Sequence, residues 1–290
     1  EVPSKGDFPS LVSSWKSHGE PLRVLHITDV HIRPEERAPE RCETLLRLMR
    51  QEVGKVDFVL NTGDSIYAAD YEDISRERML LQWDLWDSVV IKGLDGLEVL
   101  SCLGNHDSWW AAPSEEDPMW GKGYAVERLG IPERYYAVDR GPWKIIALDS
   151  INRGFLDTEQ RQWLDVQLAG MPEEQPVLIM SHQPVLSPNA LWDGMAEWQK
   201  EIIDPLHESH RPVTFISGHT HVLDSMVFHN LSFYCNGAFS GFWWEPGPED
   251  DGSQDGTPIG FAVLELYPDG RVTCQYHGFT RDELIVKQSV

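Results

Sequence analysis

Long apolar segments are missing from this 290-residue sequence. No apolar run approaches the roughly 20 residues needed to cross a bilayer. The first ten residues, EVPSKGDFPS, also lack the basic and then apolar pattern of a signal peptide. We therefore expect no membrane partner. The compartment stays open, because the sequence fits a cytoplasmic protein and also the mature form of an exported one.

Cysteine is scarce as well. The four present, Cys42, Cys102, Cys235 and Cys274, lie far apart and include no CxxC pair. This spacing argues against a disulfide-rich scaffold and against a zinc ribbon. We expect ordinary, semi-buried thiols.

Basic residues are few: 24 Lys and Arg face 47 Asp and Glu, a net charge of −23. Such a chain repels nucleic acids and anionic membranes, whose non-specific binding relies on Lys and Arg. We expect no nucleic-acid polymer as a partner. An anionic substrate needs a local positive centre, and a metal site can supply one.

What the chain does contain is an alternation of strand-like and helix-like segments. The expected strands are 21–32, 56–64, 97–107, 176–184 and 212–221, and the expected helices are 42–53, 75–90 and 158–169. Asp157 and Gln160 fit a capping box at the start of the last helix. A hairpin is expected with its turn at Arg140-Gly141, and the segments after residue 224 are typical of an antiparallel meander.

This order predicts an α/β fold in which two mixed β-sheets pack face to face with helices outside. We expect a single domain over residues 21–290 and a peripheral N-terminal arm over residues 1–20. The acidic stretch 245–258 is interpreted as a surface loop inside that domain, because it lacks the distant Glu of a calcium-binding EF-hand loop.

The five expected strands end in side chains of the kinds that often bind metals in proteins. These residues are Asp29, His31, Asp64, Asn105, His106, His182, His219 and His221. In open α/β sheets, ligands collect at the carboxyl ends of strands. A single polar strand end is unremarkable, but five with carboxylate, imidazole or carboxamide groups indicate a metal site.

The series D-x-H, G-D, G-N-H-D, H and G-H-x-H, in this order over residues 22–222, resembles the calcineurin-like metallophosphoesterase superfamily. The resemblance implies a four-layer αββα sandwich that binds two metal ions and hydrolyses phosphoric esters with a metal-activated water. The sequence GDSIYAAD replaces the GDxxDRG of protein Ser/Thr phosphatases. The chain is more similar to the cyclic-nucleotide phosphodiesterases and related small-molecule branches.

The family pattern also implies residue roles. It assigns three side chains to one metal ion: Asp29, His31 and His221. It assigns three to a second ion: Asn105, His182 and His219. Asp64 bridges the two ions, and His106 protonates the leaving oxygen or stabilises the transition state. The metals are expected to be Mn, Fe or Zn, because sites of this composition accept all three.

Several residues near these motifs have two interpretations. Tyr67 completes a GDxxY motif like that of purple acid phosphatases, in which the Tyr binds iron. Those enzymes lack a histidine at the position of His31, so the alternative is that Tyr67 forms part of the wall of the site. Asp107 is a partner of a ligand or the cap of the turn that follows it. Trp243 and Trp244 are candidates for substrate binding, ahead of Trp109 and Trp110, with packing as the alternative.

Two other residues are assigned to the surroundings of the site. His26 is expected to be packed in the first strand, and Asp149 is expected to support the site from behind.

The leading hypothesis is therefore an enzyme that hydrolyses a small phosphodiester, such as a cyclic nucleotide. A phosphomonoesterase of the acid-phosphatase or nucleotidase kind is the first alternative. A nuclease is disfavoured by the charge of −23, and a non-catalytic interaction module is disfavoured by the intact ligand set. The sequence does not indicate an oligomeric state.

Overall fold

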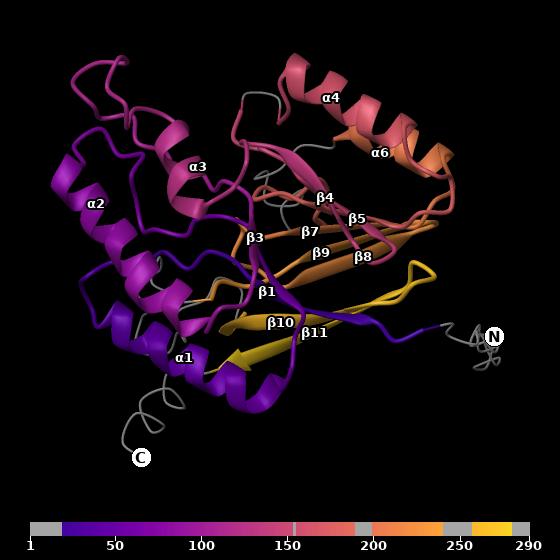
Figure 1. Ribbon diagram of the computed structural model, residues 1–290, viewed down its shortest axis with the longest axis horizontal. Coiled ribbons are helices and arrows are strands. Elements are labelled where there is room, and N and C mark those ends of the chain that lie inside the picture. The colour runs from indigo at the N-terminus through magenta and orange to yellow at the C-terminus, as the bar shows by residue number, and fades with distance from the viewer. Residues whose placement is uncertain (1–18, 153–154, 189–198, 240–256, 280–290) are drawn as a thin grey trace, which may run out of the picture.

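The computed structural model describes residues 19–152, 155–188, 199–239 and 257–279, and in these ranges two β-sheets face each other (Figure 1). The five-stranded sheet has the order β11 (Val272–Phe279), β10 (Ile259–Leu266), β1 (Leu22–Ile27), β2 (Phe58–Asn61) and β3 (Val99–Ser101). Strands β1, β2 and β3 are parallel, and β10 runs antiparallel to both β1 and β11. The sheet is therefore mixed, as expected.

The six-stranded sheet is also mixed. Its order is β4 (Tyr136–Arg140), β5 (Trp143–Ala147), β6 (Val177–Met180), β7 (Val213–Ser217), β9 (Leu231–Cys235) and β8 (Asp224–Phe228). Strands β5, β6, β7 and β9 are parallel, with antiparallel β4 and β8 at the edges. The expected meander after residue 224 is wrong, because β8 and β9 join this sheet whereas β10 and β11 join the other.

Helices cover the outer faces of both sheets (Figure 1). On the side of the five-stranded sheet lie α1 (Ala38–Val53) and α2 (Arg76–Leu85), which continues as the π-helix η1 (Trp86–Ile91). On the other side lie α4 (Thr158–Ala169) and α6 (Lys200–Glu208), and the short α3 (Gly123–Leu129) lies nearer α2. This arrangement is the predicted αββα sandwich. No helix in the described ranges is long and apolar enough to cross a membrane.

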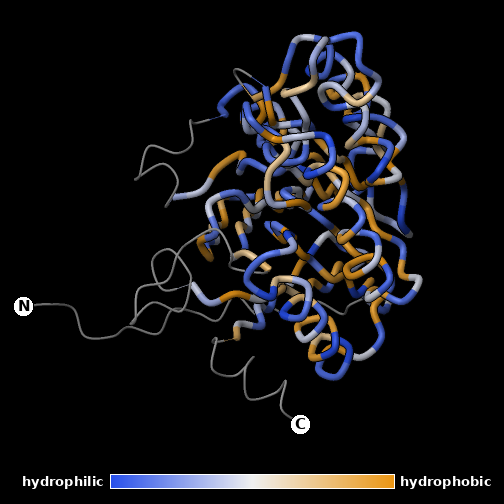
Figure 2. Tube along the Cα trace, turned by 90° about the vertical axis from the view of Figure 1, so that its left-hand side faces the viewer, coloured by the Kyte–Doolittle hydropathy of each residue, from blue (hydrophilic) through white to orange (hydrophobic). Residues whose placement is uncertain are grey.

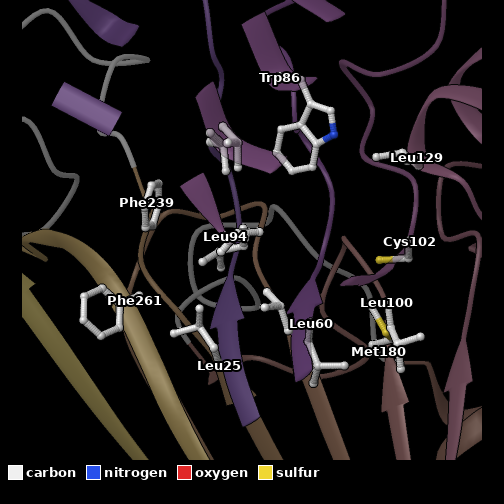
Figure 3. Packing of buried hydrophobic residues seen from close by; sticks show 14 of the residues in the cluster. Leu25, Leu60, Trp86, Leu94, Leu100, Cys102, Leu129, Met180, Phe239 and Phe261 are labelled. Carbon is white, nitrogen blue, oxygen red and sulfur yellow. The ribbon is translucent and has the colours of Figure 1, made fainter. Parts of the chain in front are cut away.

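Strand β6 shows how alternation builds the two cores. Successive side chains of a strand point to opposite faces. Leu178 and Met180 join the large cluster, which also includes residues of α1 and α2, whereas Val177 and Ile179 pack in the cluster that includes residues of α4 and α6. Figure 3 shows part of the large cluster. Apolar segments run through the middle of the molecule, and hydrophilic segments cover much of its outside (Figure 2).

Helix α4 begins as the sequence predicts, but its cap is simpler. The side chain of Asp157 accepts a hydrogen bond from the backbone N–H of Gln160, at 2.9 Å. Gln160 does not return the bond: its amide pairs with the backbone N–H and C=O of Asp149, both at 2.8 Å. Only one of the two hydrogen bonds of a capping box is therefore formed. The Gln160 amide instead pairs with the buried backbone groups of Asp149, which water does not reach, whereas the helix end is exposed.

All four cysteines are free, three of them buried. The predicted N-terminal arm and the 245–258 loop lie almost wholly outside the described residues.

Candidate metal centre

The loops after β1, β2, β3, β6 and β7 bring the predicted ligands together. The backbone there is unusual: five of these residues have a positive φ, namely Asp29 (50°), His31 (46°), Asp64 (51°), His219 (71°) and His221 (58°). Non-glycine residues seldom adopt this conformation, and it costs about 1–3 kcal/mol where it is sparsely populated. Such cost concentrated in one place is typical of a functional site.

Asp29, His31 and His221 form the first cluster, and all three are buried. The Nε2 atoms of His31 and His221 are 3.1 Å apart. Asp29 Oδ1 lies 3.2 Å from His221 Nε2 and 3.7 Å from His31 Nε2. Two imidazole nitrogens and a carboxylate oxygen therefore converge on one point.

A second cluster adjoins the first. His182 Nε2 lies 3.0 Å from Asn105 Oδ1 and 3.1 Å from His219 Nδ1. Asp64 Oδ2 is 3.1 Å from His182 Nε2 and 3.7 Å from His31 Nε2, so it faces both clusters. The structure thus brings these seven side chains together, and their role as metal ligands stays a prediction.

The donor set fits bound cations. Nitrogen lone pairs that face each other at 3.1 Å, once between His31 and His221 and once between His182 and His219, repel unless a proton or a metal lies between them. Asp29 Oδ1 is buried and accepts no aligned hydrogen bond from the described residues. Buried polar atoms normally have partners, and a metal ion would satisfy these.

Both carboxylates are held in the charged form. Burial alone would raise the pKa of Asp64, but His182, His31 and His106 lower it well below its usual range. Burial also acts to raise the pKa of Asp29, but His221 and then His31 outweigh burial, so the pKa of Asp29 is lowered. Ionised oxygens are the form that binds a metal.

Hydrogen bonds from the surroundings fix the orientation of the ligands. His182 Nδ1 lies 2.8 Å from the backbone carbonyl of Thr62 and donates to it, which leaves Nε2 for the site. Asp29 Oδ2 accepts from the Thr28 hydroxyl at 2.7 Å and from the His219 backbone N–H at 3.0 Å. Its Oδ1 is left to face the first cluster.

Two glycines allow the loops to approach each other. A Cβ on Gly104 would lie 1.9 Å from the backbone nitrogen of Asp64 and 2.1 Å from its Oδ1. A Cβ on Gly218 would lie 1.9 Å from Thr28 Oγ1 and 2.3 Å from Asp29 Oδ2. The glycines of G-N-H-D and G-H-x-H are thus required by close packing against the two carboxylates.

Asp107 supports the loop of a predicted ligand, and the turn that it closes is the one that ends at Asp107 rather than the one that follows it. Its Oδ2 accepts from the backbone N–H of Gly104 at 2.7 Å, which closes its own turn, and from that of Asp64 at 3.1 Å. Its Oδ1 accepts from Ser65 at 2.9 Å and Ile66 at 3.3 Å. Burial and the charge of Asp64 raise the pKa of Asp107 to about 7. Asp107 therefore fixes the loop that presents Asp64.

Asp70 is a residue of the site that the sequence analysis missed. Its Oδ1 lies 2.6 Å from Nδ1 of His106, while His106 Nε2 lies 3.9 Å from Asp64 Oδ2. Burial opposes a charge on His106, but Asp70 and Asp64 outweigh it and raise the pKa of the imidazole. The only signal in the sequence was a second carboxylate in GDSIYAAD, six positions after Asp64.

Tyr67 lies at the edge of the first cluster. Its ring meets that of His31 edge to face, with 6.4 Å between centroids, and the guanidinium of Arg33 lies 4.2 Å from its ring centre. Tyr71 packs edge-on against both Tyr67 and His106. Burial, then Tyr67 and Asp70, raise the pKa of Tyr71 to about 12, so it remains a phenol at neutral pH.

The tryptophans of the sequence analysis separate into three cases. Trp109 is buried and donates a hydrogen bond to the carbonyl of Ile74, which is a packing role. Trp110 is 43% exposed and packs on Trp120. Trp243 and Trp244 lie outside the described residues, so their substrate role stays a prediction.

His26 is packed, as expected. It is buried between Thr62 Oγ1, at 2.8 Å, and the side-chain amide of Asn236, at 2.7 Å. Burial lowers its pKa to about 3, so it is neutral.

Asp149 is also buried and pairs with Lys122 at 2.7 Å and Arg134 at 2.9 Å. Its contact with the site is indirect, because the next residue, Ser150, accepts a hydrogen bond from the backbone N–H of Gln183, beside His182.

The αββα sandwich and the buried imidazole and carboxylate clusters at its strand ends define a metal-dependent phosphoesterase. A sequence profile of calcineurin-like phosphoesterases matches residues 22–223, and the chain belongs to that family.

Comparison with curated proteins gives two cyanobacterial relatives. One, from Synechococcus, is described as a probable cyclic nucleotide phosphodiesterase; it is 26% identical over 94% of this chain and 99% of its own. The other, from Nostoc, is described as a 3′,5′-cyclic-nucleotide phosphodiesterase; it is 24% identical over 87% of this chain and 91% of its own. Both match nearly the whole length.

Solved structures share the fold. A purple acid phosphatase from yellow lupin superposes with a TM-score of 0.61 at 14% identity, over 93% of this chain and 56% of its own. A dimetal phosphatase from Danio rerio superposes with a TM-score of 0.60 at 18% identity, over 89% of this chain and 97% of its own.

Proposed function

We propose that the protein hydrolyses a small phosphodiester at this site, and that cyclic nucleotides are the substrate class to test first. The observation that carries the proposal is the position of Asp64 Oδ2 between two clusters of metal-binding side chains. The two relatives described as cyclic nucleotide phosphodiesterases support the choice of substrate.

Seven side chains would hold two metal ions, each of them Mn, Fe or Zn. The first ion would be held by Asp29, His31 and His221, and the second by Asn105, His182 and His219, with Asp64 shared. When bound, such ions stabilise charge on phosphoryl oxygens and lower the pKa of water. With two carboxylates, Asp29 and Asp64, among the residues that would hold two divalent ions, the loaded site would keep a net positive charge that favours a phosphate.

His106 would transfer the proton. Asp70 accepts the hydrogen on Nδ1, and Nε2 is turned toward Asp64 and the centre of the site. From there Nε2–H would donate to the departing ester oxygen. Asp70 would have the role of a positioning residue, because its carboxylate would act on the reaction through His106.

A small substrate is favoured over a nucleic-acid strand. The net charge of −23 opposes a polyanion along the surface, whereas a single phosphate needs only the local positive charge of the centre. A phosphomonoester would fit the same centre and is separated from a diester by the experiment.

The test compares hydrolysis of bis-p-nitrophenyl phosphate with that of p-nitrophenyl phosphate, with Mn²⁺ added and again after chelation. We expect faster cleavage of the diester and loss of all activity on chelation. Asp64→Ala should lose metal and activity together, whereas His106→Ala should keep the metal content and lose about 10²- to 10⁴-fold in kcat. Faster monoester cleavage would replace the proposal by a phosphomonoesterase. Undiminished activity after chelation would refute it.

A further inference from the structure

A groove lies between α1 and η1 on the outer side of the five-stranded sheet (Figure 1). Its volume is about 600 Å³, and small-molecule sites typically measure roughly 300–1,000 Å³. Among the described residues that line it, none belongs to the candidate metal centre. The groove is therefore a second place on the molecule where a small ligand could bind, and the proposed hydrolysis does not use it.

Positive charge gathers at one end of this groove. The chain has a net charge of −23, and most Arg and Lys side chains in the described ranges pair with a carboxylate. Arg50 and Lys92 line the groove, and neither forms an ion pair with a described residue. Arg47, one turn before Arg50 on α1, also lines it. Two such cations are unusual in so acidic a chain, and their place in one groove indicates an anion site.

Packing between the two helices holds Arg50 beside the segment that carries Lys92. Arg50 Nη1 donates to the backbone carbonyl of Gly93 at 2.9 Å, which joins the last turn of α1 to the residue after Lys92. A Cβ on Gly93 would lie 2.5 Å from Leu46 Cδ1, so glycine lets this segment pass close to α1. A guanidinium has five N–H donors, and the bond to Gly93 uses one of them. The other donors of Arg50 and the Lys92 ammonium have no further partner among the described residues.

The wall opposite α1 is a π-helix. At its end, the backbone N–H of Lys92 donates to the carbonyl of Asp87, five residues earlier. Turns of this kind are rare and occur frequently at functional sites. The π-helix brings Ser88 and Val89 to the groove, and the buried side chains of Val89 and Leu46 give the groove an apolar part.

Two carboxylates limit how far an anion can extend along the groove. Glu40 and Glu43 line it toward the start of α1, with Arg37 beyond them. Arg37 is about 20 Å from Arg50 along the helix. A long polyanion would run past both carboxylates, whereas a compact one stays near Arg50 and Lys92. A guanidinium binds one phosphate through two parallel hydrogen bonds, and an ammonium neutralises a second phosphate as a point charge.

We propose that Arg50 and Lys92 bind a diphosphate group in this groove. Inorganic pyrophosphate and nucleoside diphosphates share this chemistry, and in the second case the organic part would lie against Leu46 and Val89. The site is additional to the metal centre, so the inference does not depend on the proposed phosphodiesterase function.

Calorimetry with inorganic phosphate and pyrophosphate tests the site. Both anions are titrated into the full-length wild type and into Asp64→Ala, without added metal, so that the metal centre does not hold them. We expect pyrophosphate to bind about tenfold more tightly than phosphate, with the same affinity in both proteins. Arg50→Ala and Lys92→Ala should each weaken pyrophosphate binding about tenfold, the loss expected for one charged hydrogen bond.

Two further ligands identify the source of the anion. ADP separates the two kinds of diphosphate: tighter binding than that of pyrophosphate assigns an organic ligand, and equal or weaker binding assigns the inorganic ion. A peptide of five glutamates represents an acidic partner protein. If the peptide binds and pyrophosphate does not, the groove is a protein-binding surface and the inference is overturned.

Lys200→Ala is the matched control. It removes one positive charge from α6, on the side of the other sheet, where the exposed Lys200 lies 3.8 Å from Asp204. This variant should bind pyrophosphate as the wild type does. Arg50→Ala and Lys92→Ala should also cleave bis-p-nitrophenyl phosphate at the wild-type rate, because neither residue lies at the metal centre. Loss of diester cleavage in the wild type would count against the proposed function and leave the groove untouched.

Glu43→Gln tests the same idea in the opposite direction. Removal of a carboxylate from the groove should tighten pyrophosphate binding, a change that a purely structural role of Arg50 and Lys92 would not produce. Equal affinity for phosphate and pyrophosphate, or pyrophosphate binding that survives both Arg50→Ala and Lys92→Ala, overturns the inference. If those two variants do not fold, absence of a gain in Glu43→Gln overturns it.

Discussion

Oδ1 of Asp70 lies 2.6 Å from Nδ1 of His106, and this contact joins the end of one loop to the G-N-H-D motif of another. A carboxylate in this position fixes both the tautomer and the ring orientation of an imidazole. His106 Nε2 is thereby turned toward Asp64.

Asp70→Asn should lower kcat about 10- to 100-fold while metal content and KM change little, because only the orientation and charge support of His106 are lost. Steady-state kinetics with metal analysis checks this. Glu72→Gln removes an exposed carboxylate two residues away and should leave kcat unchanged. If the two variants behave alike, Asp70 has no part in positioning His106.

Asp107→Asn should destabilise the loop that carries Asp64. The carboxylate accepts four backbone N–H groups, and an amide of the same size turns an NH₂ donor toward some of them. A loss of about 1–3 kcal/mol is expected from the unsatisfied groups. Denaturant unfolding measures the loss, and a metal titration should show weaker binding. Wild-type stability and metal affinity would contradict the role given to Asp107.

Gly104→Ala should displace Asp64 and remove metal binding, since the new methyl group would overlap the backbone of Asp64. Gly123→Ala is the control, because a Cβ on Gly123 meets nothing within 4 Å and alanine favours the helix. Metal content and melting temperature are compared for the two proteins. Equal metal content in both would mean that the loops can separate without harm.

Asp157→Ala should cost about 0.5–2 kcal/mol of stability at neutral pH, through loss of the α4 cap. Burial acts to raise the pKa of Asp157, but the hydrogen bond from the Gln160 N–H and the charge of Arg134 outweigh burial and lower that pKa. Its contribution is therefore present above the unfolded pKa, near 4, and is lost as the pH falls through the lower folded value.

Unfolding curves from pH 7 to pH 2 should show the difference between wild type and Asp157→Ala shrinking in acid. Asp165→Ala, an exposed change in the same helix, should show no such trend. A difference that grows toward acid would reverse the assignment.

The motifs predicted that these seven side chains lie close together because each follows an apolar strand, and the parallel strands of each sheet end at the same edge. Asp70 escaped prediction because its partner His106 lies 36 positions away, in a different loop. The positive φ of Asp29 and Asp64 also has no local signal, since contacts with other loops impose it. The sequence predicted that the Gln160 side chain caps its own helix, whereas in the structure this side chain pairs with the backbone of Asp149, after the end of β5.

The place of β10 beside β1 has a consequence for the order in which the centre is made. Strand β1 carries Asp29 and His31 at its end, and its two neighbours are β2 and the much later β10. During synthesis on a ribosome, this sheet remains open on one side until β10 has emerged. Pairing of such remote segments also slows folding. The strand that leads to Asp29 and His31 is thus paired along both of its edges only once a segment far along the sequence has folded against it.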